Sequence, residues 1–227
     1  LQSAHASHFA RRLSLPLSSA LAHKAKMNAY LKASKYIDFD SEPLSQKAAE
    51  LSSGLVGDVA IANACYVFVR DQIRHSWDFR SNPVTCRASD ALKFGTGYCY
   101  AKSHLLAALL RANGIPAGLC YQRLSVGDSG APYCLHGLNA VFLKGYGWYR
   151  CDARGNKANV NAQFRPPHEV LAFPIREPEE CDLPEIWAEP LPSVTEVLER
   201  YTDVADVHRN LPDVVLWANN SLQARRP

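Results

Sequence analysis

One long apolar helix followed at once by a run of strands is the feature of this sequence that most constrains its fold. Residues 98–112 carry apolar side chains at helical spacing, with Ala101, Leu105 and Leu109 on one stripe. The run ends at 113-NGIP-116, where glycine can take a left-handed conformation and proline cannot continue the helix. We therefore predict a helix over 98–112 that buries its apolar stripe.

The segments that follow this helix have the pattern of extended strands. Residues 117–126 and 134–143 are predicted to be two strands joined by the loop 127–132, and 148–153 returns the chain after the turn 144-KGYG-147. Three strands in succession, with no helix between them, form an antiparallel meander rather than a parallel sheet. The prediction is an α+β fold in which one central helix packs on an antiparallel sheet.

Further helices are predicted at 45–52, 58–74, 88–94 and 193–204. Asp58 is a suitable N-cap for the second of them, and 193-SVTE-196 fits a capping box for the last. Residues 75–87, which contain Asn82-Pro83, are predicted to be a loop. The tail from Pro166 onwards is rich in proline and acidic residues.

Charge separates the first 26 residues from the remainder. They hold four basic residues and no acidic one, and they are rich in serine and alanine, whereas Met27 begins a stretch that reads like a natural start. We expect 1–26 to be an extension outside the fold and 27–227 to be a single domain, with its core at about 58–160.

The remainder is nearly neutral: the whole chain has a formal net charge of +3 at pH 7 and the first 26 residues carry +4, which leaves −1. There is thus no general electrostatic reason to bind nucleic acid or an anionic membrane. No stretch is long and apolar enough for a transmembrane helix. We expect neither kind of partner, and the sequence does not predict an oligomeric state.

The cysteines indicate a reducing environment rather than a disulfide framework. There are seven, an odd number, and no two of them form a C-x-x-C pair. Cys134, His136 and Cys151 lack the paired spacing of a structural zinc site. We therefore expect no metal, no organic cofactor and a cytoplasmic location.

One cysteine stands apart by its position. Cys99 follows 95-GTGY-98 directly and lies in the first turn of the predicted helix 98–112. Unpaired N–H groups at a helix start carry partial positive charge, which favours a thiolate and can stabilise an oxyanion. Cys99 is therefore a candidate nucleophile.

His136 and Asp152 are the natural partners for such a thiolate, since an imidazole moves protons and a carboxylate fixes its tautomer. They flank one predicted hairpin. If Gly145 is the centre of its turn, Asp152 becomes the diagonal neighbour of His136 on the same face. A turn centred between two residues would put them on opposite faces unless a bulge intervenes, so both arrangements remain open at this point.

Each of these residues also has an ordinary structural explanation. Free cysteines are mostly small buried hydrophobes, a lone histidine is commonly a satisfied structural residue, and Asp152 could be a turn residue. The functional interpretation depends on all three occurring together, at a helix start and on two successive strands. Among the other polar residues, His104 is expected to face solvent or pack loosely, and Lys102, Arg111 and Lys144 to be solvated.

The motifs around these residues resemble a known family. GTGYC followed by LLRANGIPA, then LHGLNAVFL, then GWYRCDARGN, is similar to the transglutaminase-like superfamily of papain-fold cysteine enzymes, over roughly residues 58–160. The resemblance implies a papain-like fold. By position it implies Cys99 as nucleophile, His136 as general base and acid, and Asp152 as the orienting carboxylate.

Two positions depart from the family's pattern. Leu138 stands where members often have tryptophan two residues after the histidine, and Ala153-Arg154 follow the carboxylate where Pro-Thr is common. Neither touches the triad, but both bear on the substrate class. The family also has an upstream oxyanion donor, which here would be Trp77 or Asn82.

The resemblance implies acyl transfer through a thioester on Cys99, with a peptide or protein amide as substrate. Water as acceptor makes the enzyme a peptidase or deamidase, of the bacterial transglutaminase-like cysteine protease type; an amine acceptor makes it a transglutaminase. We favour hydrolysis. One alternative is a non-catalytic binding or scaffold module, which a sealed cleft would favour and an open one would not. An arylamine-type acyltransferase ranks low, because the Arg-Gly-Gly before its cysteine is absent here.

Overall fold

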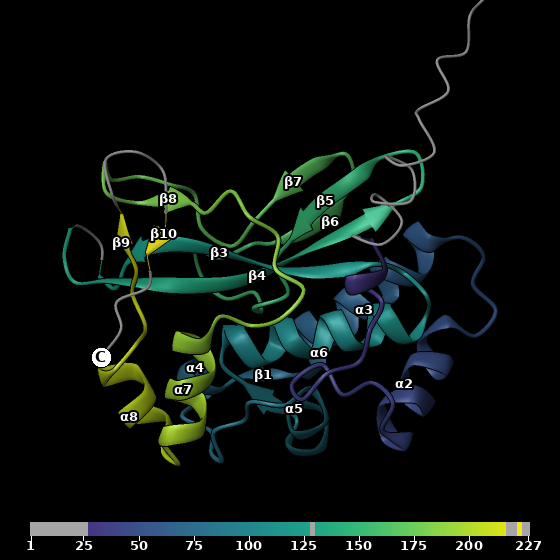
Figure 1. Ribbon diagram of the computed structural model, residues 1–227, viewed down its shortest axis with the longest axis horizontal. Helices are drawn as coiled ribbons and strands as arrows, with labels where there is room; N and C mark the ends of the chain where they lie inside the picture. The colour runs from purple at the N-terminus through teal and green to yellow at the C-terminus, as the bar shows by residue number, and fades with distance from the viewer. Residues whose placement is uncertain (1–26, 128–129, 217–221, 224–227) are drawn as a thin grey trace, which may run out of the picture.

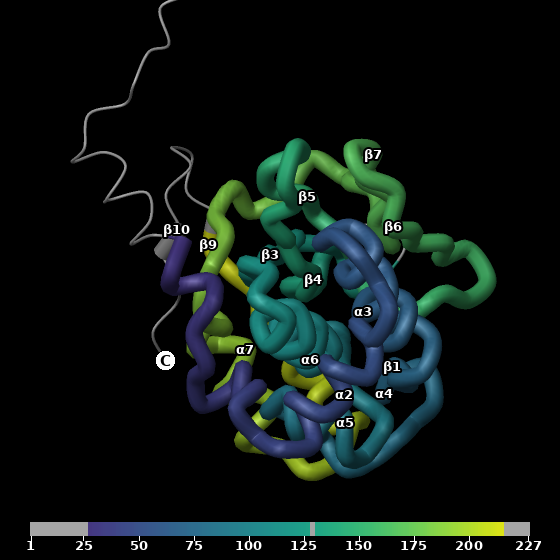
Figure 2. Tube along the Cα trace, turned by 90° about the vertical axis from the view of Figure 1, so that its right-hand side faces the viewer, coloured from purple at the N-terminus to yellow at the C-terminus, as the bar shows by residue number. Residues whose placement is uncertain are grey.

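A single helix, α6 (Cys99–Ala112), runs through the centre of the protein (Figure 1). The computed structural model describes residues 27–127, 130–216 and 222–223, and the predicted extension 1–26 lies outside them. The sheet lies along one side of α6 and other helices lie along the rest, so that α6 seen end-on is ringed by chain (Figure 2). The α+β class predicted from the order of helix and strands is confirmed.

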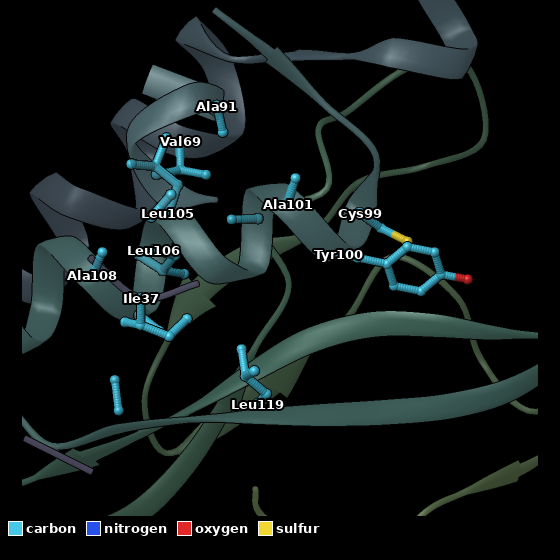
Figure 3. Close-up of a cluster of buried hydrophobic side chains, with 14 of the residues drawn as sticks. Ile37, Val69, Ala91, Cys99, Tyr100, Ala101, Leu105, Leu106, Ala108 and Leu119 are labelled. Atoms are coloured by element: carbon cyan, nitrogen blue, oxygen red, sulfur yellow. The ribbon is translucent and has the colours of Figure 1, made fainter. Parts of the chain in front are cut away.

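The burial of α6 extends beyond the predicted stripe to every residue from Cys99 to Arg111. Leu105, Leu106 and Leu109 have no exposed surface, and burying each contributes roughly 1.5–3 kcal/mol to stability. Figure 3 shows Leu105 and Leu106 among apolar side chains from neighbouring elements, with Cys99 at the end of the helix. The packing of α6 therefore fixes the position of the sulfur relative to the sheet.

The polar residues of α6 are buried as well, so the expectation that Lys102, His104 and Arg111 reach solvent is wrong. The helix is covered all round, and each of these side chains instead donates hydrogen bonds to backbone carbonyls, which offset the cost of burial. The carbonyls are those of Arg70 and Ile73 for Lys102, Cys86 for His104, and Lys32, Ala117 and Ala188 for Arg111.

The main sheet is antiparallel, with the strand order β5–β4–β3–β8. The predicted meander consists of β3 (Ala117–Ser125), β4 (Tyr133–Leu143) and β5 (Gly147–Cys151). In the β4–β5 hairpin, Asn139 lies opposite Cys151 and Leu143 opposite Gly147, which makes Gly145 the centre of the turn. Of the two possible registers, this is the one that puts positions 136 and 152 on the same face.

The remaining helices of the described residues surround α6 or lie beyond it. They are α2 (Glu42–Ser52), α3 (Asp58–Gln72), α4 (Ser76–Phe79), α5 (Ala88–Phe94), α7 (Pro192–Arg200) and α8 (Val204–Arg209). Helices α2, α3 and α5 pack on α6 and confirm the three helices predicted upstream of it. The predicted loop 75–87 is wrong in part, because it contains α4.

The predicted last helix, 193–204, is two helices. The first begins at Pro192 with Leu191 as its N-cap, so the predicted capping box does not form, and it ends at Arg200. Asp203 then caps the second, accepting a hydrogen bond from the N–H of Ala205 at 2.7 Å. A new N-cap inside the predicted helix thus starts a separate element.

Short strands that were not predicted complete the fold. They are β1 (Arg74–His75), β2 (Thr96–Gly97), β6 (Gln163–Arg165), β7 (His168–Val170), β8 (Cys181–Asp182), β9 (Val215–Leu216) and β10 (Leu222–Gln223). β1 pairs in parallel with β2, which lies immediately before α6 in the chain. Within the described ranges, the helices are all too short or too polar to cross a membrane.

Candidate active site

Cys99 is the first residue of α6, as predicted. Tyr98 before it has an extended backbone and caps the helix without a side-chain hydrogen bond. Gly97 packs so closely that a Cβ there would lie 3.1 Å from the Cβ of Ala101 and 3.2 Å from Oγ1 of Thr85. The chain from β2 into α6 is therefore held tightly, and the sulfur lies at the electropositive end of the helix.

The sulfur of Cys99 lies against the edge of β4. The N–H of Gly137 donates to Sγ at 3.5 Å. Among the described residues, no strand pairs with this edge of β4 beyond Asn139, because β5 ends at Cys151. The start of α6 fills that gap and brings the sulfur beside the residue that follows His136.

Glycine at position 137 is required by this close approach. A Cβ there would lie 2.9 Å from Cδ1 and 3.3 Å from Cα of Tyr100, which real Cβ atoms do not tolerate without a shift of their neighbours. Gly137 therefore sets the distance between the helix start and the strand.

The substitution Gly137→Ala is expected to lower any activity that depends on the Cys99 sulfur by roughly tenfold to a hundredfold, because a displacement near 1 Å at the reacting atoms has effects of this size. The stability cost should be only about 1–3 kcal/mol. Steady-state rates and thermal midpoints measure both. Gly127→Ala is the matched control, since a Cβ there meets nothing within 4 Å. Activity equal to that of the control would show that the spacing is unimportant.

His136 and Asp152 meet as a buried pair. Nε2 of His136 lies 2.7 Å from Oδ2 of Asp152. The carboxylate has no exposed surface and also accepts the N–H groups of Arg154 at 3.0 Å and Ala172 at 3.1 Å. Because Nε2 is bound to the carboxylate, Nδ1 is the ring nitrogen that remains for the sulfur of Cys99.

The electrostatics of this pair favour its charged form. Burial alone would lower the pKa of the His136 imidazole, but the charge and hydrogen bond of Asp152, with the neighbouring Cys99 sulfur, outweigh burial and raise the pKa to about 10. Burial would raise the pKa of Asp152, but His136 and the two backbone N–H groups hold it below its usual value. At neutral pH a cationic imidazole therefore lies beside the sulfur.

The other cysteines lack these surroundings. All seven are free, and burial raises the pKa values of Cys86, Cys120 and Cys134 to about 12.

Within the part of the chain that the structure describes, no group of three or more His, Cys, Asp or Glu side chains is arranged to hold a metal ion.

Neither predicted oxyanion donor is supported by the structure. The side-chain amide of Asn82 donates to Oδ2 of Asp203 at 3.0 Å and accepts the N–H of Val204 at 2.9 Å, so it serves the start of α8. Trp77 stacks on His208 with ring centroids 3.5 Å apart. The remaining candidate for an oxyanion donor is the backbone N–H of Cys99 itself.

Another buried histidine close to the site was not predicted. His75 lies opposite Gly97 in the β1–β2 pair, with its ring centroid 5.0 Å from that of Tyr98. Burial, and then the charge of Arg154, lower its pKa, so its ring is neutral. The sequence around His75 was predicted to be a loop, and nothing in it indicated that this histidine lies near the site.

A segment from the tail covers the His136–Asp152 pair and was likewise not predicted. The ring of Phe173 meets that of His136 edge-on, with centroids 5.0 Å apart. Its backbone carbonyl accepts from Nε2 of Gln122 at 3.3 Å, and Gln122 lies directly opposite His136 on β3. The β3–β4 register could have identified Gln122, whereas the tail offered no pattern that would identify Phe173.

Comparisons with known proteins identify a matching family. A family model described as the transglutaminase-like superfamily matches residues 45–153, a range that includes Cys99, His136 and Asp152. No curated protein matches the chain.

Two similar solved structures come from bacteria. One is a candidate cysteine protease from Cytophaga hutchinsonii, with 21% identity and a TM-score of 0.48 over 57% of this chain and 42% of that chain. The other is the periplasmic domain of TgpA from Pseudomonas aeruginosa, with 19% identity and a TM-score of 0.44 over 57% of this chain and 47% of that one. The match therefore spans less than half the length of either structure.

Proposed function

Since residues 45–153 match the model of the transglutaminase-like superfamily, we propose that the chain is a cysteine-dependent enzyme that cleaves amide bonds through a thioester. The observation that carries the proposal is the convergence of three side chains. Cys99 comes from the start of α6, His136 from β4 and Asp152 from the residue after β5, and they meet at one gap in the sheet. None of the three requires a cofactor for this chemistry.

The proposed first step is attack of the Cys99 sulfur on an amide carbonyl. The N–H of Cys99 at the helix start stabilises the oxyanion. The His136 imidazolium gives its proton to the leaving amine or ammonia as the C–N bond breaks, which leaves an acyl thioester on the sulfur. Asp152 holds the ring in place throughout.

In the second step, neutral His136 takes a proton from water, and the resulting hydroxide attacks the thioester. This releases the carboxylic acid and restores the thiolate–imidazolium pair. We favour water over an amine as acceptor because the site is buried: Cys99 is 3% and His136 5% exposed. Water reaches such a site more easily than a protein lysine does. A peptide or protein amide is the proposed substrate.

The proposed location is the cytoplasm, with no nucleic acid or membrane as partner. Its support is that all seven cysteines are free, which suits a reducing compartment, and that the charge is nearly balanced.

The same burial favours a second candidate function, a non-catalytic binding module. A sealed site is what such a module would show, whereas an intact set of nucleophile, imidazole and carboxylate is what an enzyme needs. The two functions differ in the reactivity of one thiol, which can be measured directly.

Iodoacetamide at pH 6 is expected to alkylate Cys99 at least about tenfold faster than the other six cysteines, because only a thiolate reacts and Cys99 lies beside a cationic imidazole. Peptide mapping by mass spectrometry assigns the sites. In His136→Ala the advantage should disappear. The enzyme proposal is further tested by intact mass after exposure to a library of peptide amides, where an acyl adduct on Cys99 is expected. Equal slow labelling of all seven thiols would favour the module.

A further inference from the structure

The open edge of β4 beside the candidate site is occupied by the chain's own tail. The N–H of Leu135 donates to the carbonyl of Pro212 at 2.7 Å. On the same edge, the carbonyl of Leu135 accepts from the hydroxyl of Tyr100, and the N–H of Gly137 donates to Cys99. The N–H of Leu135 is thus an edge group that pairs with the C-terminal segment.

Proline suits this place for a simple reason. The acceptor of Leu135 is already satisfied by Tyr100, so a segment lying here needs a carbonyl but no N–H group. Pro212 has a carbonyl and lacks the N–H. Pairing of an extended segment with a strand edge through its carbonyl is the way in which many proteins bind peptides.

The tail reaches this edge as a cover segment, residues 203–214, which includes α8. In Figure 1 it passes from α8 beside α4 up to β9, near the ends of β3 and β4. Its lower part is held by Val204 and Val207, which are buried in the core. His208 contacts the residue before Cys99: its Nδ1 lies 3.0 Å from the hydroxyl of Tyr98.

The upper part of the cover segment is held by charge at Asp213 and by Val214, which is buried in the core. Asp213 accepts two hydrogen bonds from the guanidinium of Arg123, at 2.7 and 2.9 Å. Arg123 lies directly opposite Leu135 in the β3–β4 register, so the ion pair and the Pro212 hydrogen bond hold the same point. Polar contacts of this kind can be exchanged for equivalent ones, whereas Val204 and Val207 anchor the segment at one end and Val214 at the other.

We propose that residues 211–214 occupy a peptide-binding edge at Leu135, and that an extended polypeptide substrate takes their place to reach Cys99. At rest the segment lies against the strand edge two residues from Gly137, whose N–H donates to the Cys99 sulfur. This inference rests on the proposed function and adds the substrate class: an extended chain whose carbonyl pairs with the N–H of Leu135.

The first test is Asp213→Ala, which removes the ion pair and leaves the site residues intact. Alkylation of Cys99 by iodoacetamide is expected to be about three to ten times faster, and hydrogen exchange at the Leu135 amide to rise in step. Arg209→Ala is the matched control, because its ion pair with Asp206 lies within α8 and should leave both rates unchanged. Unchanged rates in Asp213→Ala would overturn the proposal.

Exchanging the two charges of the ion pair tests whether the higher rates come from loss of the ion pair or from a general loss of structure. Arg123→Glu alone should also raise both rates, and the double variant R123E/D213R should restore the wild-type values. If the double variant stays as reactive as the single ones, the ion pair does not hold the cover closed.

The peptide arm uses a synthetic copy of residues 208–216, HRNLPDVVL. Added to Asp213→Ala, it should protect the Leu135 amide again and slow alkylation of Cys99, whereas a scrambled peptide should do neither. Failure of the true peptide to protect Leu135 would reject this edge as a peptide site. Amide exchange can be repeated in Cys99→Ala, so this outcome is separate from loss of the proposed activity.

Discussion

Cys99→Ala is expected to reduce the rate of amide cleavage by at least about a thousandfold, because removal of a nucleophile in a cooperating set abolishes nearly all the catalysis that the set provides. The fold should remain, since alanine occupies less space than cysteine at the first residue of α6 and keeps its helix. Release of amine or ammonia from a peptide substrate measures the rate. Circular dichroism and the thermal midpoint measure the fold.

The matched control for this variant is Cys134→Ala. Cys134 is two residues before His136 on the same strand and is more exposed than Cys99, but burial raises the pKa of its thiol to about 12. Its removal should change the rate less than about twofold. If Cys99→Ala keeps its activity, or if Cys134→Ala loses as much, the thioester mechanism on Cys99 is wrong.

The parts of the fold that the sequence predicted are those fixed by neighbouring residues. The helix α6 and its stop depend on apolar spacing and on 113-NGIP-116, and the β4–β5 turn depends on Gly145 with its positive φ. Both are local, so their bounds were predicted to within about two residues. The pairing of His136 with Asp152 follows from that turn and needed only the correct choice of register.

The failures concern contacts between distant segments. The buried Lys102 donates to carbonyls at the end of α3, and the buried Arg111 to those of Lys32, Ala117 and Ala188. Amphipathic spacing does not report such contacts. The cover over the site comes from the tail, where Ala172 and Pro212 act through backbone N–H and C=O groups. Every residue has such groups, apart from the N–H of proline, so no side-chain pattern could have indicated these contacts.

The candidate site combines both kinds of information. The residue types were predictable because each lies at a recognisable local feature: Cys99 at a helix start, His136 and Asp152 on a hairpin. Local features did not show how Cys99 reaches this pair, because its approach depends on Gly137 leaving room for the ring of Tyr100 at the edge of β4. A glycine inside a strand carries little meaning in a sequence until the neighbour that needs the space is known.

Asp152→Asn is expected to lower activity by roughly a thousandfold to ten-thousandfold, the range found when the carboxylate of a triad becomes an amide. The amide can no longer stabilise the imidazolium, and its N–H groups would face the donors on His136 and Ala172. The pKa of His136 should fall from about 10 towards or below its ordinary value of 6.5, because burial then acts with less opposition. The rate of peptide cleavage and histidine NMR titration measure the two effects.

The same variant changes how stability depends on pH. In the wild type the folded state holds the His136 proton more tightly than the unfolded state does. The resulting stabilisation is complete below about pH 6.5 and is lost as the pH rises to about 10, where the raised pKa of His136 lies. The lowered pKa of Asp152 adds stability that is lost as the pH falls below its ordinary value of 3.8. Asp152→Asn should remove the decline between pH 6.5 and 10.

Urea unfolding at pH 6, 8 and 10 decides this prediction, with Glu169→Gln as the control for loss of one carboxylate. Glu169 pairs with Arg150 at the surface and should lower stability by less than about 1 kcal/mol at each pH. Subtracting the control isolates the buried pair from general charge effects. Should the wild type and Asp152→Asn lose stability in parallel from pH 6 to 10, His136 is not held as a cation by Asp152. The thiolate would then depend on the helix start and Gly137 alone.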